Sequence, residues 1–275
     1  MATAGAPRHS GRVQPTDPHP DDPHPDDPQY ADDQAPPDEA PDDPAPSTAP
    51  WAMQLVLRDE RTARATHLAA CEAAAEAAVR LIDDVRARPG GPWHEAVATG
   101  DGGPIRKIVR RARGSRYTAV AALDGVEVEH RGAQVLALVP APVDRVPPDL
   151  ARLQVGGTQL PDVGEPAEAV PGGLVVALTP LTGLSTGKAA AQCGHAAHLA
   201  LRLLTDAEVA AWRATGYAVR VELPDGDGWR AAVAGARVHV RDGGFTEVVP
   251  GTMTAVARPV PVAAPAGLRV TGRPG

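Results

Sequence analysis

The chain has 275 residues and a formal net charge of −7, and this length is enough for two small domains. It contains no run of about 18 apolar residues and no apolar segment of the signal-peptide type near its start, so we expect a cytoplasmic protein without a membrane span. The two cysteines, Cys71 and Cys193, lie outside any CxxC or HExxH spacing, which predicts neither a disulfide scaffold nor a metal site. No cofactor is expected.

Proline and negative charge are concentrated at the start of the chain. Residues 1–50 hold 13 of the 30 prolines and 11 of the 34 acidic residues, but only two basic ones, Arg8 and Arg12. A segment with so few aliphatic side chains cannot offset the entropy that it would lose on ordering. We therefore predict a disordered acidic tail over 1–50 and a flexible tail over 263–275, on either side of a nearly neutral remainder.

From residue 51 onward, short apolar runs alternate with alanine-rich stretches, which is typical of strands and helices in alternating order. In the first half the pattern predicts strands over 53–58, 105–111 and 135–139 and helices over 62–82 and 115–123. In the second half it predicts strands over 174–179, 217–223, 237–240 and 253–258 and helices over 187–204, 206–214 and 228–234. The fold class is α/β, with two fused three-layer units, each a small mixed β-sheet flanked by helices. The units are expected over 51–143 and 173–262, joined by a linker over 144–172.

The two halves resemble each other in more than the order of their elements. Their long helices end in similar strings at 79–82 and 201–204, and an offset of 122 residues places Cys71 on Cys193. Each half also closes with a strand that runs into proline. This agreement predicts an internal duplication.

The first group of candidate residues opens a helix in the second half. Residues 182–188 are rich in glycine and hydroxyl groups, but Ala189 stands where a nucleotide-hydrolysing P-loop needs a hydroxyl, and the glycines are one residue too close. Free N–H groups at a helix start and the charge of Lys188 still favour an anion. Lys188, Gln192 and His195 share one stripe of this helix. Alternatively, they are an exposed lysine and two satisfied polar residues.

The second group lies on a loop near the end of the chain. Asp242 is followed by two glycines, by a Pro-Gly turn and by the hydroxyl groups of Thr246, Thr252 and Thr254. The backbone of such a loop can come close to a ligand. Alternatively, the segment is an ordinary hairpin in which Asp242 is a turn residue.

Together these strings resemble the second class of peptidyl-tRNA hydrolases, over about residues 173–260. That family has Gly-Lys-x-x-Ala-Gln-x-x-His-Ala at its first helix, and residues 187–196 of this chain read Gly-Lys-Ala-Ala-Ala-Gln-Cys-Gly-His-Ala. Its later signature is Asp-Ala-Gly-x-Thr followed by Pro-Gly-(Ser/Thr)-x-Thr. Here 242–246 read Asp-Gly-Gly-Phe-Thr and 250–254 read Pro-Gly-Thr-Met-Thr. Gly243 and Phe245 depart from the family, which has Ala and often Arg at these positions.

The resemblance implies hydrolysis of the ester between a peptide and the 3′ end of tRNA, with water as the nucleophile. The catalytic residues that it implies are Lys188, Asp242, Thr246 and Thr254. The substrate-binding residues that it implies are Gly187, Gln192, His195, Gly244 and Thr252. In this hypothesis Asp242 orients or deprotonates the water, Lys188 offsets charge on the ester oxyanion, and the catalytic threonines hold the 3′ end.

The first half lacks these residues. At the positions that match Lys188 and the two polar residues after it on the helix, the first half has Thr66, Ala70 and Ala73. Members of the family commonly work as homodimers. We therefore expect the inert half to replace a second subunit, so that the protein is a monomer with an intramolecular pseudo-dimer.

Basic residues around the second predicted strand could extend a tRNA-binding surface. They are Arg106, Lys107, Arg110, Arg111, Arg113 and Arg116. Strand alternation would place some of them on a solvated face regardless of function. Two other functions stay open, namely a non-catalytic RNA-binding or adaptor protein that keeps the fold, and a related hydrolase that acts on a different ester or amide.

Overall fold

The structure is a computed structural model. It describes residues 47–62, 64–101, 106–181, 183–244 and 246–262. Residues 1–46 of the tail predicted over 1–50, the tail predicted over 263–275 and the loop residue Phe245 lie outside the described residues. The described residues, from Ser47 to Val262, belong to one compact unit. No helix in the described part is both long and apolar enough to cross a membrane.

The first half forms a mixed sheet with the strand order β3-β4-β1-β2-β6, in which β5 also pairs with β1. Strand β1 is parallel to β2 and antiparallel to β4, and β4 is antiparallel to β3. The strands are β1 (Trp51–Arg58), β2 (Arg106–Ala112), β3 (Gly125–His130), β4 (Ala133–Leu138), β5 (Ala141–Pro142) and β6 (Gln154–Val155). The helices are α1 (His67–Ile82), the 3-10 helix η2 (Val85–Ala87), α2 (His94–Asp101), α3 (Ser115–Ala121) and α4 (Pro148–Ala151).

The second half forms a four-stranded sheet with the order β8-β7-β10-β9. Strand β7 is parallel to β8 and antiparallel to β10, and β10 is antiparallel to β9. The strands are β7 (Leu174–Leu178), β8 (Val219–Glu222), β9 (Val238–Arg241) and β10 (Met253–Pro259). The helices are α5 (Thr186–Leu203), α6 (Asp206–Ala214) and α7 (Gly226–Gly235).

The two sheets share one topology. Read from its other edge, the second sheet has the order β9-β10-β7-β8, which matches β3-β4-β1-β2 strand for strand and direction for direction. The helices match too, because α1, α2 and α3 occupy the same places in the first half as α5, α6 and α7 in the second. The α/β class, with two mixed sheets flanked by helices, is therefore confirmed.

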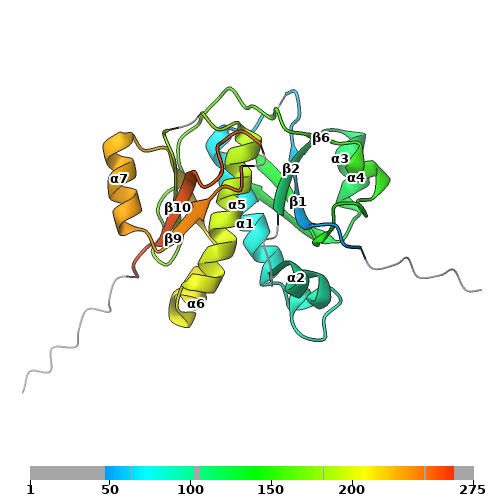
Figure 1. Cartoon of the computed structure of the whole chain (residues 1–275), viewed down its shortest axis with the longest axis horizontal. Helices are drawn as coiled ribbons and strands as arrows, with labels where there is room; N and C mark the ends of the chain where they lie inside the picture. Colours follow the sequence, from blue (N-terminus) through cyan, green and yellow to red (C-terminus); the bar gives the residue numbers. More distant parts are fainter. Residues whose placement is uncertain (1–46, 63, 102–105, 182, 245, 263–275) are drawn as a thin grey trace, which may run out of the picture. The chain divides into compact units, whose positions relative to one another are not determined.

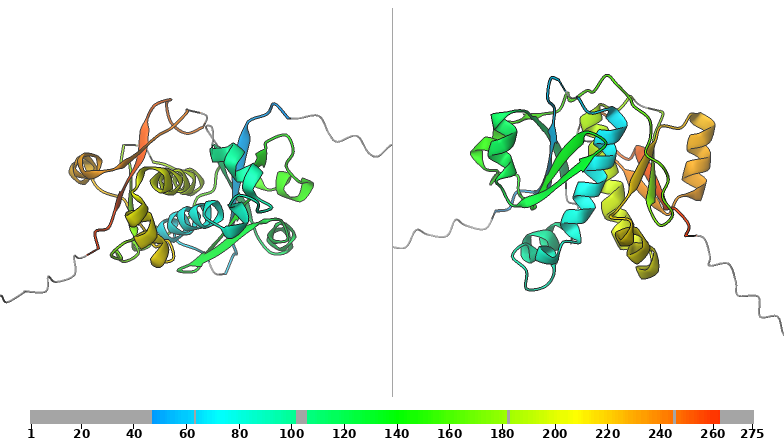
Figure 2. Two further views of the ribbon diagram at one scale, coloured as in Figure 1. Left: turned by 90° about the horizontal axis from the view of Figure 1, so that it is seen from below. Right: turned by 180° about the vertical axis from the view of Figure 1, so that it is seen from behind.

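Helices α1 and α5 form a central layer between the two sheets (Figures 1 and 2). Helix α1 packs on β3 and β4 of the first sheet and reaches β8 of the second, whereas α5 packs on β9 and β10 and reaches β2 of the first. On the outer faces, α3 and α4 cover the first sheet and α7 covers the second. Each sheet is therefore shielded from water on both faces.

Small side chains allow the central helices to pack closely. The facing surfaces of α1 and α5 consist mainly of buried alanines, and the buried Cys71 of α1 lies next to Cys193 of α5. Buried residues of both sheets join these helices in one continuous apolar cluster. The two halves therefore share a core, which makes the burial of each half dependent on the other.

Several local features differ from the sequence-based expectation. Helix α1 begins at His67 rather than at residue 62, because Thr66 acts as its N-cap and accepts a hydrogen bond from the Ala69 amide at 3.3 Å. Helix α2 and strand β3 were not predicted. The stretch over 144–172, expected as a linker, contains α4 and β6, and β6 pairs with β2 at the edge of the first sheet.

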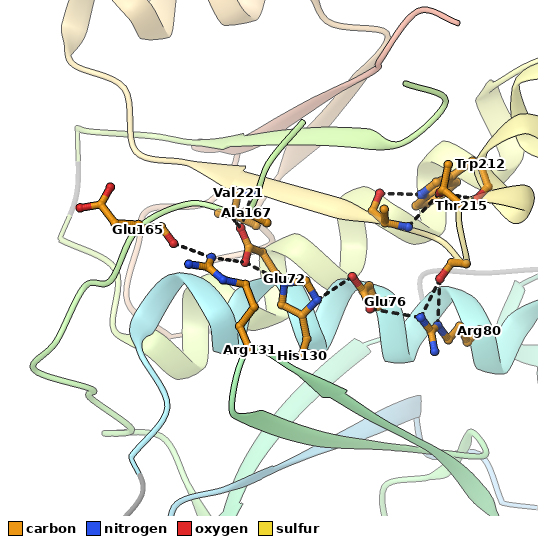
Figure 3. A network of polar contacts seen from close by, with 12 residues as sticks. Glu72, Glu76, Arg80, His130, Arg131, Glu165, Ala167, Trp212, Thr215 and Val221 are labelled. Carbon is orange, nitrogen blue, oxygen red and sulfur yellow. Dashed lines mark hydrogen bonds and ion pairs between the residues drawn. The ribbon is translucent and has the colours of Figure 1, made fainter. Parts of the chain in front are cut away.

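A buried carboxylate on α1 ties the two halves together (Figure 3). Glu72 is fully buried. Its carboxylate accepts hydrogen bonds from the Val221 amide on β8 at 3.1 Å and from the Ala167 amide at 2.8 Å. On the other side it contacts His130 at 3.1 Å and Arg131 at 3.3 Å, at the turn between β3 and β4. A charge buried this deeply is tolerated because each oxygen has partners.

The Glu72 network includes a histidine that titrates. His130 contacts Glu72 through Nε2 at 3.1 Å and Glu76 through Nδ1 at 3.0 Å, and an imidazole that donates from both nitrogens is charged. Burial by itself lowers the pKa of His130, but the hydrogen bonds to Glu72 and Glu76 outweigh it and raise the pKa to about 9. The ordinary histidine value is about 6.5.

The stability of the protein should therefore fall at alkaline pH. Because the folded-state pKa of His130 lies above its unfolded value, its contribution is complete below about pH 6.5 and is lost as the pH rises through about 9. The expected loss is on the order of 3 kcal/mol. Urea denaturation of the wild type and of His130→Gln between pH 6 and pH 10 measures it. Parallel pH profiles for the two proteins would contradict this account.

Candidate active site

Asp242 reaches the interior because the alternation of β9 continues one residue past its end. Val238 and Val240 of β9 face the core, whereas His239 and Arg241 are exposed, so the next inward position is Asp242. Its backbone is fixed by the neighbouring turn, since its amide donates to the Thr252 carbonyl at 2.9 Å and its carbonyl accepts from the Gly251 amide at 2.7 Å. The carboxylate therefore points toward α5 from a rigid position.

Lys188 meets this carboxylate from the first turn of α5. Its ammonium nitrogen lies 2.5 Å from Asp242 Oδ2 and donates to Thr246 Oγ1 at 2.9 Å. The exposed fraction of the side chain is 11% for Lys188 and 5% for Asp242, so the ion pair is largely withdrawn from water. The structure thus brings Lys188 of α5 together with Asp242 and Thr246, which lie on the distant loop after β9.

Gln192 extends the cluster one helical turn further along α5. Its Nε2 donates to Asp242 Oδ2 at 2.8 Å, and its Oε1 accepts from the Thr254 hydroxyl at 2.6 Å. The other carboxylate oxygen, Oδ1, accepts from the Gly244 amide at 2.7 Å. Lys188, Gln192 and Gly244 therefore all contact Asp242, which fixes the direction of its carboxylate.

Glu247 joins the loop after β9 to the start of α5. Its carboxylate accepts from the Ser185 hydroxyl at 2.5 Å and from the Ser185 amide at 2.9 Å. Ser185 is the N-cap of α5, and its hydroxyl accepts from the Lys188 amide at 3.2 Å. Sequence reasoning assigned no role to Glu247, because a contact between two loops leaves no spacing pattern in the chain.

The expectation of free amide groups at the start of α5 is wrong. The Thr186 amide donates to Gln159 Oε1 at 3.3 Å and the Gly187 amide to the Thr158 carbonyl at 3.1 Å. The Lys188 amide is used by the N-cap. All of these donors have protein partners, so positive charge at this end comes from the Lys188 side chain.

Three expected substrate contacts have other roles in this structure. Thr254 is fully buried, and its hydroxyl is engaged by Gln192. Gly187 is buried and its amide is already bonded, whereas the Thr252 hydroxyl donates to the Val249 carbonyl at 2.7 Å and closes the turn. Thr254 and Gly187 therefore support the cluster from inside the fold, whereas Thr252 is half-exposed and closes the turn beside it.

His195 stands apart from the hydrogen-bonded cluster. Dense packing lowers its pKa well below the ordinary value, and the neighbouring charges of Lys107, His198 and Lys188 lower it further, so the ring is neutral at pH 7. Lys107 comes from β2 of the first sheet and lies 3.0 Å from His198 Nδ1. The first half thus places a buried lysine against the back of α5.

No protein-family model matches the chain, and neither the curated proteins nor the solved structures include a significant match. Within the part of the chain that the structure describes, no group of three His, Cys, Asp or Glu side chains could hold a metal ion.

The loop after β9 should tolerate alanine at one glycine and not at another. Gly244 and Gly251 both have positive φ, +75° and +82°, but a Cβ at Gly244 would lie 2.3 Å from the Pro250 ring, whereas a Cβ at Gly251 would meet no atom within 4 Å. Backbone strain is common to both sites. The clash should cost Gly244→Ala an additional ~1–3 kcal/mol. Denaturant unfolding of the two variants measures the difference, and equal losses would contradict the loop geometry.

Proposed function

We propose that this protein hydrolyses the ester that joins a peptide to the 3′ end of tRNA. The observation that carries the proposal is the contact of Lys188 with Asp242 and Thr246. The two sequence segments that resemble the second class of peptidyl-tRNA hydrolases thus meet in one cluster. Water is the nucleophile in this proposal.

Lys188 and Asp242 each keep one hydrogen-bonding position that a substrate or a water molecule could use. An ammonium group has three N–H donors and a carboxylate has about four lone-pair positions. Lys188 uses two donors on Asp242 and Thr246, so one remains for the developing oxyanion of the ester. Asp242 receives Lys188, Gln192 and Gly244, so one position remains for a water molecule.

The reaction then proceeds with a balanced transfer of protons. Asp242 accepts a proton from the water as its oxygen attacks the ester carbonyl carbon, and Lys188 stabilises the charge on the carbonyl oxygen. The bond to the ribose oxygen breaks, and that oxygen takes the proton from Asp242. The products are a peptide carboxylic acid, which releases its remaining proton to solvent, and a tRNA with a free 3′-terminal hydroxyl. The Thr246 hydroxyl, which accepts from Lys188, is free to donate to the 3′-terminal nucleotide.

Gln192 and Thr254 act as positioning residues in this proposal. The Thr254 hydroxyl holds the Gln192 amide, and that amide holds Asp242 Oδ2. Because Thr254 is fully buried, its influence on the reaction passes through Gln192. This replaces the direct substrate contact that the resemblance implied for Thr254.

A second function, a non-catalytic RNA-binding or adaptor protein, is favoured by one observation. The Asp242 side chain is 5% exposed and has protein donors on both oxygens, a geometry that would also suit a purely structural ion pair. The two functions differ in a single readout. The enzyme releases the amino acid from an N-blocked aminoacyl-tRNA with multiple turnovers, whereas the binding protein does not.

Removal of either partner of the ion pair should abolish most turnover. Lys188→Ala removes the oxyanion donor and Asp242→Asn removes the base, so each should lower kcat by about a hundredfold or more. Asp206→Asn, at an exposed position on α6, is the matched control and should keep the wild-type rate. Release from N-blocked aminoacyl-tRNA gives the rates. Near wild-type rates for both site variants would exclude the proposed roles.

A further inference from the structure

The first half has a cavity of about 720 Å³ at the carboxyl ends of the parallel strands β1 and β2. Open α/β sheets commonly bind ligands at this edge. The lining is mainly charged, with five guanidinium groups and one carboxylate. The charged lining residues are Asp59, Arg64, Arg111, Arg113, Arg116 and Arg152. We call this cavity the arginine pocket.

The positive charge of the arginine pocket is only partly neutralised. Arg64 and Arg111 share one carboxylate, that of Asp59, at 3.6 and 3.5 Å, and Asp59 Oδ1 is buried without a hydrogen-bond partner. Arg113 and Arg116 are exposed, and no hydrogen bond or ion pair to another described residue is found for either. Several guanidinium donors are therefore free to bind an anion.

The basic residues on and after β2 fall into two groups, those buried in the core and those that line the cavity. Lys107 and Arg110 of β2 are buried, where Lys107 contacts His198 and Arg110 donates to Gln54 at 2.8 Å. Both therefore have structural partners and cannot reach a ligand outside the fold. Arg111, Arg113 and Arg116 line the cavity instead. The basic residues that the sequence suggested as a tRNA-binding surface are thus divided between the core and the arginine pocket.

The chemistry of the lining favours phosphate. Planar guanidinium groups bind phosphate oxygens in pairs of parallel hydrogen bonds. Among the described lining residues none is aromatic, so none of them offers a ring on which a base could stack, and Ala112 is the one apolar side chain in that set. A phosphodiester backbone fits this surface better than a nucleobase or an apolar ligand.

The arginine pocket lies close to the start of α5. Gln154 lines the cavity, and Thr158, four residues later, accepts the hydrogen bond from Gly187 next to Lys188. Four residues can span no more than about 14 Å. In Figure 1, β6 and the start of α5 both lie at the upper edge of the view. A single-stranded nucleic acid whose end lies in the Lys188–Asp242 cluster can therefore reach the arginine pocket.

We infer that the arginine pocket binds the phosphate backbone of the tRNA whose acylated 3′ end enters the Lys188–Asp242 cluster. The half that lacks the catalytic residues thereby supplies affinity, and the half that has them supplies chemistry. The identity of the RNA rests on the proposed function. The charge of the arginine pocket does not.

Binding of deacylated tRNA tests the inference independently of hydrolysis. The full chain is titrated into 5′-labelled tRNA at several salt concentrations, with the double variant Arg113→Gln/Arg116→Gln and the control Arg88→Gln/Arg230→Gln, which removes the same charge from exposed positions elsewhere. Neither Arg113 nor Arg116 forms a hydrogen bond or ion pair with another described residue, and Arg113 has only an electrostatic attraction to Glu60, so the variant should fold. We expect its Kd to rise about tenfold and its salt slope to fall by about 2, since each phosphate contact contributes about one. The control should change Kd less than twofold.

Three results would overturn the inference. They are no tRNA binding by the wild type at low salt, equal loss in both double variants, and displacement of tRNA by poly-glutamate or pyrophosphate as readily as by unlabelled tRNA. Failure of the proposed function looks different. In that case the wild type releases no amino acid from N-blocked aminoacyl-tRNA, while tRNA binding still depends on Arg113 and Arg116.

Discussion

The packing of α1 against α5 is the constraint on which the rest of the structure depends. Alanine-rich faces let the two helices approach, and the equivalent residues Cys71 and Cys193 meet between them. Each helix also reaches across to the other half, α1 to β8 and α5 to β2. Neither half buries its apolar face alone, so both must fold together. This shared core fixes α5, and therefore Lys188, relative to the first sheet.

One segment covers the starting turns of both central helices. Carbonyl groups at Asp162 and Val163 accept the first amides of α1, and the Thr158 carbonyl accepts an amide of α5. The first amide groups of both helices thereby have protein partners, so the charge presented at each helix start depends on the nearby side chains. The second half presents the ammonium group of Lys188, whereas α1 begins after the uncharged Thr66. The two halves share a topology but differ in the chemistry at this end.

The sequence predicted those features that repeat along the chain. The stripe on α5 correctly placed Gln192 beside Lys188, whereas the inward position of Asp242, which continues the alternation of β9, was not predicted. Features that depend on contacts between distant loops were missed, namely the bond from Ser185 to Glu247 and the segment around Thr158. Strand β3 was missed because its short alternation of valine and glutamate is weak, and it is stabilised by pairing with β4. Burial of Thr254 followed from tertiary packing, which no local pattern encodes.

We propose that the two unlike halves of this chain take the place of a pair of identical subunits, since α1 and α5 pack against each other between the two sheets. Sedimentation equilibrium of the full chain over a hundredfold range of protein concentration tests this most directly. The account predicts one species of 28.4 kDa at every concentration. A rise toward twice that mass with increasing concentration would contradict it.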